Sequence, residues 1–364
     1  MDFFEKAAKE ISSHVNNDHR DNWDYLRFGK RKSGSKNILK AYLQKLIKHR
    51  GYYHMTAIHV LLSNSFQIHY FEYLYDNLNN EDDRKLLLQV IAYRILGYTK
   101  VKLPLNTPEY WSKIREIENL TDKSDYIDPK FLDIFLYKFN LEKLNYPIKI
   151  YFSTIGIMID FIVKQYEYNK GGTVIKADKG DIVIDGGGCW GDTALFFANE
   201  VGPDGKVFSF EFIPNNISIF EKNIAMNEKL KENIELVRNP LWKDSVTKVY
   251  YKDDGPASNV GLEAFNGQDG ECYTMNIDEL VKQKSIDKID FIKMDIEGAE
   301  LNALRGATET IKKYKPKLAI ALYHSTEEFE SIPSFIKTIV PEYKLYFSHC
   351  TIFGEESILF AKVD

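Results

Sequence analysis

The spacing of apolar residues changes character near residue 170. Before this point, apolar residues recur every three to four positions, which is the period of an amphipathic helix. This spacing predicts helices at about residues 37–49, 55–64, 67–79, 82–97, 129–140 and 155–168. Three acidic residues at 81–83 suit a helix first turn, because carboxylates are favoured at the positive end of the helix dipole. Short β-like runs at 101–105 and 148–152 interrupt the helices.

After residue 170, short apolar strands alternate with helices. Strands are expected at about residues 182–184, 206–210, 234–237, 291–294, 318–322, 343–347 and 357–363. Helices are expected at about residues 193–199, 214–230, 277–284 and 299–313. Such alternation predicts an α/β fold with a Rossmann-like, mostly parallel sheet that is covered on both faces. The last two strands could pair antiparallel.

Length and composition suit two soluble domains. At 364 residues the chain exceeds the usual size of one core. We therefore expect a mostly helical N-terminal domain at residues 1–170 and the α/β domain at residues 171–364. Apolar residues make up 44% and charged residues 28%, which is ordinary for a soluble protein, and a net charge of −5 gives no reason to expect a nucleic-acid partner.

The cysteines and the N-terminal segment indicate a reducing, cytoplasmic setting. The 3 cysteines are scattered and form no CxxC pair, which argues against a disulfide framework and against a structural zinc site. The N-terminal segment is charged throughout and lacks the apolar run of a signal peptide. No stretch approaches the roughly 18 apolar residues that a membrane span requires. We therefore expect a cytoplasmic protein without a transmembrane segment.

The densest chemical signal is Asp185 followed by a glycine-rich turn that ends at Gly191. The turn follows a predicted strand and opens a helix, where glycines allow the backbone to approach a ligand. The spacing GxGxxG alone is weak and would suggest a dinucleotide. A carboxylate at Asp185 faces a pyrophosphate poorly, but it suits a ligand with an ammonium group. The alternative is a tight strand-to-helix connection that binds nothing.

Acidic residues also end two other predicted strands. Glu211 follows the strand at 206–210, where an acid can accept hydrogen bonds from both ribose hydroxyls of NAD or of S-adenosylmethionine. Asp295 follows the strand at 291–294 and should reach the same edge of the sheet. Glu297 and Glu300 come next, and both could simply be acids in the first turn of a helix.

These motifs resemble those of the FkbM-family S-adenosylmethionine-dependent methyltransferases. The resemblance rests on residues 183–193 (VIDGGGCWGDT), 210–215 (FEFIPN), 274–278 (TMNID), 292–300 (IKMDIEGAE) and Tyr323-His324. It covers about residues 172–363 and implies a class I methyltransferase fold. It also implies methyl transfer, usually to a hydroxyl, and commonly to sugars of surface polysaccharides or glycosylated natural products.

The resemblance further implies which residues bind S-adenosylmethionine. Asp185, Gly187 and Gly191 would shape the pocket for the methionine part, and Glu211 would hold the ribose. Residues after the third strand would line the adenine pocket, either Asn239 or the adjacent Leu241 and Trp242. Asp295 would lie near the transferring methyl group. Gly188-Cys189 departs from the Ala-Asn that is common in the family.

Methyl transfer to a hydroxyl requires positioning and removal of the hydroxyl proton, by a base or with the help of a metal. His324 follows a predicted strand and is the best base candidate, although it could instead cap the next segment. His349 is expected to be structural. Asp295, Glu297 and His324 could alternatively bind Mg²⁺ or Mn²⁺, but their spacing does not demand a metal.

The function that this resemblance implies is O-methylation of a sugar hydroxyl during biosynthesis of a cell-surface polysaccharide or other glycan. The first alternative is an NAD-dependent oxidoreductase or epimerase, and the second is a non-catalytic Rossmann-fold binding module. The expected partner is a carbohydrate or glycan acceptor. The N-terminal domain would cover the cleft, select the acceptor or mediate formation of a homodimer.

Overall fold

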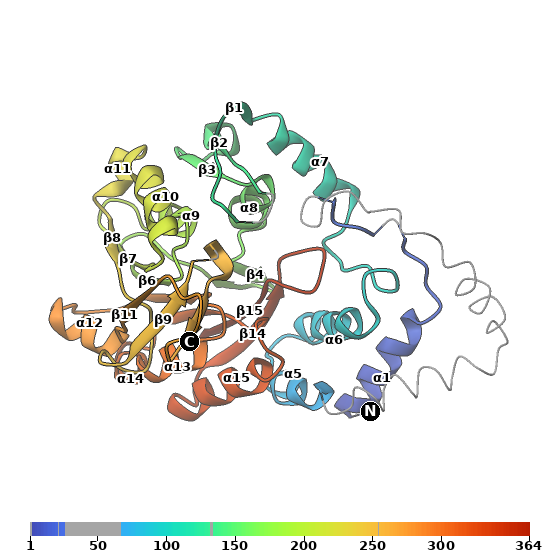
Figure 1. Cartoon of the computed structure of the whole chain (residues 1–364). Coiled ribbons are helices and arrows are strands. Elements are labelled where there is room, and N and C mark those ends of the chain that lie inside the picture. Colours follow the sequence, from blue (N-terminus) through green and yellow to red (C-terminus); the bar gives the residue numbers. More distant parts are fainter. Residues whose placement is uncertain (1, 21, 26–66, 132–133, 254) are drawn as a thin grey trace.

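A seven-stranded sheet forms the centre of the protein (Figure 1). The computed structural model describes residues 2–20, 22–25, 67–131, 134–253 and 255–364. The strands are β6 (Ile182–Gly186), β7 (Lys206–Phe210), β8 (Ile234–Val237), β12 (Phe291–Met294), β13 (Lys317–Ala321), β14 (Lys344–His349) and β15 (Ser357–Lys362). Their order is β14-β15-β13-β12-β6-β7-β8. Neighbouring strands are parallel except that β15 runs antiparallel to β13 and β14. The mostly parallel sheet and the antiparallel late pair are thus confirmed.

Helices cover both faces of this sheet. They are α9 (Asp192–Val201), α10 (Pro214–Ala225), α11 (Glu228–Lys231), α12 (Ile277–Gln283), α13 (Glu300–Arg305), α14 (Thr308–Tyr314) and α15 (Glu328–Ile339). Successive strand residues point to opposite faces. In β6, Val183 therefore packs with α9 and α10, while Ile184 packs with α12 to α15. Burial on both sides explains why the strands read as continuous apolar runs.

Two of the helices expected from the sequence are each interrupted. The helix predicted at 214–230 is divided at Asn227, whose side chain instead exchanges hydrogen bonds with the backbone of Lys149. The helix predicted at 299–313 is divided at Gly306, whose backbone oxygen accepts a hydrogen bond from the Asp278 backbone N–H at 3.0 Å. A side chain is excluded there, because a Cβ would lie 2.2 Å from the backbone oxygen of Trp242. Both interruptions come from contacts with distant segments.

Among the described residues before 170, helices predominate over strands, as predicted. The elements of this region are α1 (Phe3–His14), η1 (His69–Phe71), α5 (Glu72–Asn77), α6 (Glu81–Leu96), α7 (Pro108–Glu118), β1 (Asp122–Ile127), β2 (Leu136–Asn140), η2 (Leu141–Leu144), β3 (Lys149–Phe152), α8 (Thr154–Ile157) and the π-helix η3 (Met158–Val163). A short hairpin of β4 (Tyr168–Lys170) and β5 (Thr173–Ile175) leads to the central sheet. The helices predicted at 37–49 and 55–64 lie outside the described residues.

Two further predictions for this region were wrong. The segment 129–140 is not a helix, because its end forms β2, which pairs with β1 and β3 in a three-stranded sheet. The run 101–105 is not a strand. The backbone oxygen of Val101 accepts a hydrogen bond from the side chain of Asn22, which takes the place of a neighbouring strand. The strand predicted at 148–152 is confirmed as β3.

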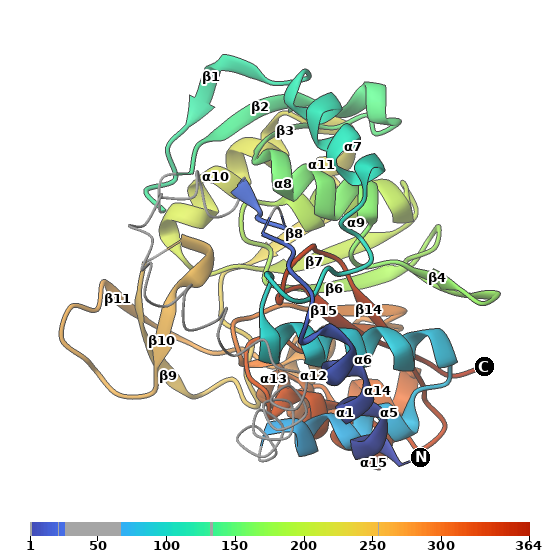
Figure 2. The same cartoon turned by 90° about the vertical axis from the view of Figure 1, so that its right-hand side faces the viewer.

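The N-terminal elements pack against both sides of the central sheet. Figure 2 shows α1, α5 and α6 beside α15, whereas α7, α8 and β1 to β3 lie near α9 and α10. Buried residues of α1, α5 and α6 share one apolar cluster with α15 and β14. Buried residues of α7, β2 and β3 share the other cluster with α9 and α10. The described residues before 170 therefore contribute to the same two cores as the sheet, and the two-domain division stays a prediction.

Asp83 ties the N-terminal helices to the end of the chain. It lies in the first turn of α6, but its side chain is fully buried rather than solvated. Its Oδ2 accepts hydrogen bonds from the Tyr168 hydroxyl and from the Phe347 backbone N–H, both at 2.9 Å. Lys170 Nζ lies 3.6 Å from Oδ1. Buried carboxylates require such partners, so these contacts hold α6 against β4 and β14.

Replacing Tyr168 by phenylalanine is expected to lower the free energy of unfolding by about 1.5–3 kcal/mol, since the change removes a buried hydrogen bond to a carboxylate. Urea denaturation followed by circular dichroism measures this change. Tyr126→Phe is the matched control, because Tyr126 is 53% exposed. Equal stability of the two variants would show that the Asp83 contact contributes nothing.

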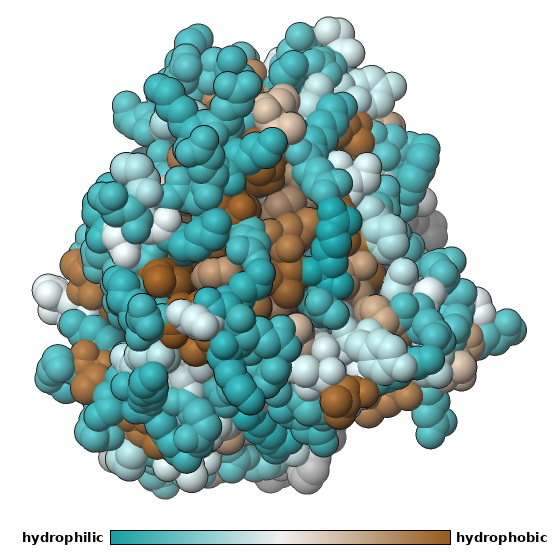
Figure 3. All heavy atoms as spheres, turned by 90° about the vertical axis from the view of Figure 1, so that its left-hand side faces the viewer, coloured by the Kyte–Doolittle hydropathy of each residue, from teal (hydrophilic) through white to brown (hydrophobic). Residues whose placement is uncertain are grey.

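A small antiparallel sheet is inserted between β8 and α12, and the sequence pattern missed it. It consists of β9 (Lys248–Lys252), β10 (Asn259–Gly261) and β11 (Gly270–Tyr273), with the turn η4 (Gly255–Ala257) between its first two strands. Exposed apolar side chains in and near it include Val246, Val260, Leu262 and Tyr273. Figure 3 shows apolar residues gathered in the middle of one face of the molecule, surrounded by hydrophilic residues.

None of the helices in the described ranges has both the length and the apolar character of a membrane span.

Candidate active site

The glycine turn joins β6 to α9 and lies against two other strand ends. Gly187 has φ +84°, and a Cβ there would lie 2.0 Å from the backbone oxygen of Asp295. A Cβ at Gly188 would lie 2.1 Å from Ser209 Oγ, and one at Gly191 (φ +85°) would meet Phe220 at 3.2 Å. The packing of the protein itself therefore requires glycine at these positions. Close approach of a ligand is therefore not needed to explain these glycines. The glycines alone are weaker evidence for a bound ligand than the sequence suggested.

Asp185 lies beneath this turn and is fully buried. Its carboxylate accepts hydrogen bonds from Thr193 Oγ1 at 3.0 Å and from Ser209 Oγ at 2.7 Å. Lys293 Nζ, also buried, lies 3.1 Å from Asp185 Oδ1. Protein groups thus surround the carboxylate that the sequence suggested for an ammonium group of a ligand. In this structure Asp185 positions the turn from below.

Lys293 is the residue at this site that the sequence analysis overlooked. Besides the ion pair, its Nζ donates hydrogen bonds to the backbone oxygens of Gly186 at 3.0 Å and Gly187 at 2.7 Å. Burial alone would lower the pKa of Lys293, but the carboxylates of Asp185 and Asp295 outweigh it and raise this pKa. The lysine is therefore charged and connects β12 to the glycine turn. The sequence offered one indication of this role, because Lys293 is a charged residue inside the otherwise apolar strand at residues 291–294.

Glu211 follows β7 beside the glycine turn and is 7% exposed. Its Oε1 accepts hydrogen bonds from the backbone N–H groups of Phe212 at 2.7 Å and Ile213 at 2.8 Å. Its Oε2 accepts a longer hydrogen bond from Asn216 Nδ2 at 3.3 Å, and the Cys189 backbone N–H also stabilises the charged carboxylate. Burial raises the pKa of Glu211 to about 7 even though these donors favour the charged form. A carboxylate oxygen has two lone pairs, so Oε2 can accept a further hydrogen bond.

The residues expected to line an adenine pocket lie in different places. The Asn239 side chain donates a hydrogen bond to the backbone oxygen of Tyr273, in the small inserted sheet. Leu241 lies against the glycine turn, because a Cβ on Gly186 would be 2.8 Å from Leu241 Cδ1. The Trp242 backbone contacts Met275 and the Gly306 turn. Of the three, Leu241 is the one that these contacts place next to the turn.

Trp190 lies within the glycine motif and packs in the protein interior. It is 5% exposed, its Nε1 donates to Asn216 Oδ1 at 3.1 Å, and its ring contacts Phe152 edge-on at 6.1 Å. Phe212, which follows Glu211, is partly exposed and lies edge-on to Tyr251 at 5.6 Å. An aromatic residue directly after the acid was a signal that the sequence analysis did not use.

Asp295 follows β12 directly and is held by two tyrosines. Its Oδ2 accepts a hydrogen bond from Tyr166 at 2.9 Å, and Tyr323 donates to Oδ1 at 2.8 Å. Burial and the Asp295 carboxylate raise the pKa of both tyrosines well above the ordinary value, so both stay protonated as donors. Tyr166 comes from the segment before residue 170. The segment before residue 170 therefore contributes a side chain to the site, although no motif in that segment had indicated this.

His324 lies among carboxylates. Its Nε2 is 3.4 Å from Asp295 Oδ1 and 3.8 Å from Glu297 Oε2, and its Nδ1 is 3.1 Å from Glu300 Oε1. Burial would lower the pKa of His324, but the Glu300, Asp295 and Glu297 carboxylates raise it to about 10. At neutral pH the ring is therefore protonated in this arrangement. The sequence-predicted role of general base stays a prediction, and it requires loss of that proton.

The structure thus brings Asp295, Glu297 and His324 together, and Gly187 meets the backbone of Asp295. Glu211 lies at the neighbouring strand end. His349, by contrast, is buried between Ser357 Oγ at 2.9 Å and the Phe353 backbone oxygen at 2.5 Å, and burial lowers its pKa to about 4. These contacts fit the structural role expected for His349.

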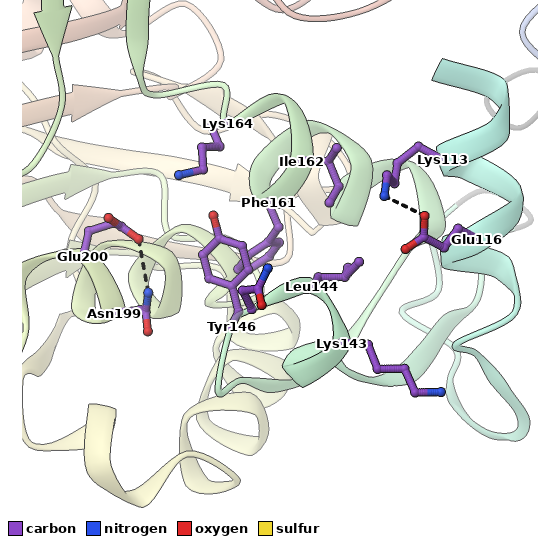
Figure 4. A pocket seen from close by; sticks show the side chains of 11 residues that line it. Lys113, Glu116, Lys143, Leu144, Tyr146, Phe161, Ile162, Lys164, Asn199 and Glu200 are labelled. Atoms are coloured by element: carbon purple, nitrogen blue, oxygen red, sulfur yellow. Dashed lines mark hydrogen bonds and ion pairs between the residues drawn. The ribbon is translucent and has the colours of Figure 1, made fainter. Parts of the chain in front are cut away.

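A separate cavity of about 420 Å³ lies at the far end of α9 (Figure 4). Lys113, Lys143 and Lys164 lie around it together with Tyr146 and Glu200. Because α9 begins at the glycine turn, its end at Glu200 lies toward the opposite edge of the sheet. Ligands of open α/β sheets bind beyond the carboxyl ends of the strands, so this cavity is not the candidate active site.

The strand order, with β15 antiparallel among parallel strands, and the residues at the ends of β6, β7 and β12 define a class I methyltransferase fold. Residues 170–350 match the family model described as "Methyltransferase FkbM domain". Through this domain the chain belongs to the FkbM methyltransferase family.

One of the similar solved structures supports this fold, and two weaker matches are given beside it. Methyltransferase FkbM from Methylobacillus flagellatus KT matches with a TM-score of 0.51 and 16% identity, over 83% of this chain and 59% of that chain. Fibrillarin from Aeropyrum pernix with natively bound S-adenosyl-L-methionine matches with a TM-score of 0.34 and 12% identity, over 51% and 68% of the two chains. A putative rRNA-methylase from Clostridium thermocellum matches with a TM-score of 0.33 and 16% identity, over 52% and 89%. A search of curated protein sequences found no match.

Proposed function

We propose that this protein is an S-adenosylmethionine-dependent O-methyltransferase that acts on a sugar hydroxyl in the biosynthesis of a cell-surface glycan. The observation that carries the proposal is the position of Glu211. This buried carboxylate follows β7 beside the glycine turn, in a chain whose 170–350 segment is an FkbM domain. An acid at this strand end suits the two hydroxyls of a ribose.

The residues present fit the cofactor. Glu211 Oε2 has capacity for a further hydrogen bond, and Leu241 offers an apolar contact beside the turn. Glu211 would hold the ribose, the backbone from Gly187 to Gly191 would face the methionine part, and Asp295 would lie near the transferring methyl group. When bound, S-adenosylmethionine supplies an electrophilic methyl carbon on a sulfonium. The protein positions the acceptor hydroxyl in line with that carbon.

The acceptor side of the site is polar and acidic. Asp295, Glu297 and His324 offer carboxylate oxygens and an imidazole at the ends of β12 and β13. Such groups hydrogen-bond sugar hydroxyls, and removal of the hydroxyl proton by His324 or with the help of a metal would complete the reaction. Tyr166 belongs to the N-terminal region, which supports the proposal that this region helps to select the acceptor.

Calorimetric titration with S-adenosylhomocysteine, with NAD⁺ as the parallel ligand, tests the proposal. We expect micromolar binding of S-adenosylhomocysteine and no binding of NAD⁺. The antiparallel β15 already departs from the all-parallel strand order of dinucleotide-binding domains. Binding of NAD⁺ alone would restore the oxidoreductase alternative, and binding of neither ligand would favour a non-catalytic module.

A further inference from the structure

Three side chains from separate elements converge beside Asp295. Asp295 follows β12, Glu300 begins α13, and His324 follows β13. One ligand-type atom from each of the three lies within 4.8 Å of the other two. From the sequence, Glu297 is the expected third partner of Asp295 and His324, and Glu300 is expected to be an acid of the helix first turn. In the structure Glu300 is the fully buried member, whereas the Glu297 side chain is 49% exposed.

Buried polar atoms in this group have no hydrogen-bond partner. The His324 side chain is 9% exposed, and its ring nitrogens lie 3.1 Å from Glu300 Oε1 and 3.4 Å from Asp295 Oδ1, but within the described part of the chain neither nitrogen makes a hydrogen bond of suitable angle. Glu300 Oε1 accepts a hydrogen bond from the Ile296 backbone N–H at 2.7 Å, but Oε2 is buried and likewise unpartnered. Leaving such atoms unsatisfied is costly, so a missing partner is expected between them.

The charges around the group indicate that this partner is a cation. Carboxylates of Asp295, Glu297 and Glu300 all lie within 4.0 Å of the His324 ring, so a single imidazole faces three acids. Glu328 is close as well, since its Oε2 accepts hydrogen bonds from the backbone N–H groups of His324 and Ser325. Such an excess of partly buried negative charge favours binding of a positive ion.

We propose that Asp295, Glu300 and His324 bind one divalent cation of the Mn²⁺ type. Metal binding displaces the proton of the His324 ring to solvent, because a ligating imidazole must be neutral. Two carboxylate oxygens and one imidazole nitrogen then form a mixed set of hard and intermediate donors, which suits Mn²⁺ better than Ca²⁺. The hydroxyl groups of Tyr166 and Tyr323 hold the Asp295 carboxylate in place, as outer partners of metal ligands do.

Three protein ligands leave coordination positions open. On the proposed function, on which this role rests, one of these positions takes the acceptor hydroxyl. A bound cation stabilises the alkoxide form of such a hydroxyl and orients it, so the proton leaves more easily. The proton passes to solvent or to a neighbouring carboxylate, and the oxygen then forms the bond to the methyl carbon as the bond from that carbon to sulfur breaks.

Titration of the metal-free protein with Mn²⁺ alone, followed by the electron paramagnetic resonance signal of free Mn²⁺, tests the site. We expect one bound ion per chain and at least tenfold weaker binding by the Glu300→Gln and His324→Gln variants. Glu309→Gln is the matched control, because Glu309 is 79% exposed on the neighbouring helix α14 and should bind like the wild type. Unchanged binding by both site variants, or no stoichiometric binding by the wild type, would overturn the proposal.

A spectroscopic measurement on the unaltered protein guards against variants that fail to fold. Electron spin-echo envelope modulation of bound Mn²⁺ should show a coordinated imidazole nitrogen, and its absence would overturn the site. Titration of the same samples with S-adenosylhomocysteine separates the two proposals. Cofactor binding without Mn²⁺ binding would reject the metal site alone, and Mn²⁺ binding without cofactor binding would reject the proposed function.

Discussion

Replacing Lys293 by methionine is expected to lower the free energy of unfolding by about 3–5 kcal/mol, because it leaves the fully buried Asp185 carboxylate without its counter-charge. The change also removes the two hydrogen bonds from Nζ to the oxygens of Gly186 and Gly187. The glycine turn should therefore loosen as well. Urea denaturation of the purified variant measures the loss from the transition midpoint.

Two further variants make this prediction specific. Lys288→Met removes an ion pair to Asp290 of 2.8 Å between side chains that are 50% and 24% exposed, and it should cost less than about 1 kcal/mol. Adding Asp185→Asn to Lys293→Met should restore part of the lost stability, since a neutral side chain no longer needs a buried counter-charge. If Lys293→Met and Lys288→Met were equally stable, the buried pair would not support the turn.

Replacing Glu211 by glutamine is expected to weaken binding of S-adenosylhomocysteine by about 10- to 100-fold at pH 8, because hydrogen bonds to a charged acceptor contribute about 1.5–3 kcal/mol. The same change should stabilise the free protein at that pH. Burial raises the pKa of Glu211 from its ordinary value of 4.5 to about 7 in the folded chain. The folded state therefore keeps a proton that the unfolded state has lost between these pH values.

The sign of the stability change follows from this difference. Stability falls as pH rises from about 4.5 to 7, where the folded chain binds more protons than the unfolded chain, and the whole cost is present above pH 7. Glutamine carries no charge, so the variant should be about 3 kcal/mol more stable than the wild type at pH 8 and similar below about pH 4. Thermal or urea unfolding at both pH values measures the difference.

Glu235→Gln is the control for this second prediction. Glu235 lies on the adjacent strand β8, and its side chain, 34% exposed, pairs with Lys284 at 2.8 Å. Its replacement should leave cofactor affinity unchanged and alter stability by less than about 1 kcal/mol. If Glu211→Gln bound S-adenosylhomocysteine like the wild type, the ribose role would be lost. If its relative stability did not depend on pH, the raised pKa would be wrong.

Local pattern was sufficient for the central sheet, because a strand buried on both faces must be apolar throughout. Where the sequence pattern predicted the wrong element, contacts between distant segments determine the local structure. The segment that ends in β2 pairs with β3 instead of continuing as a helix, and the small sheet β9 to β11 follows no strong alternation of apolar and polar residues. The helices at 214–230 and 299–313 are divided by contacts of Asn227 and Gly306, which no window of neighbouring residues reveals.

The candidate site shows the same division. The residue pattern alone predicted an acid at the ends of β6, β7 and β12 and a glycine turn after β6, because strand ends and tight turns leave local signals. The role of each acid depends on contacts that form when the chain folds. Asp185 is enclosed by Lys293, Glu211 keeps an available oxygen, and Glu300 turns inward to His324. Burial and neighbouring charge set these roles, and both arise from residues far apart in the chain.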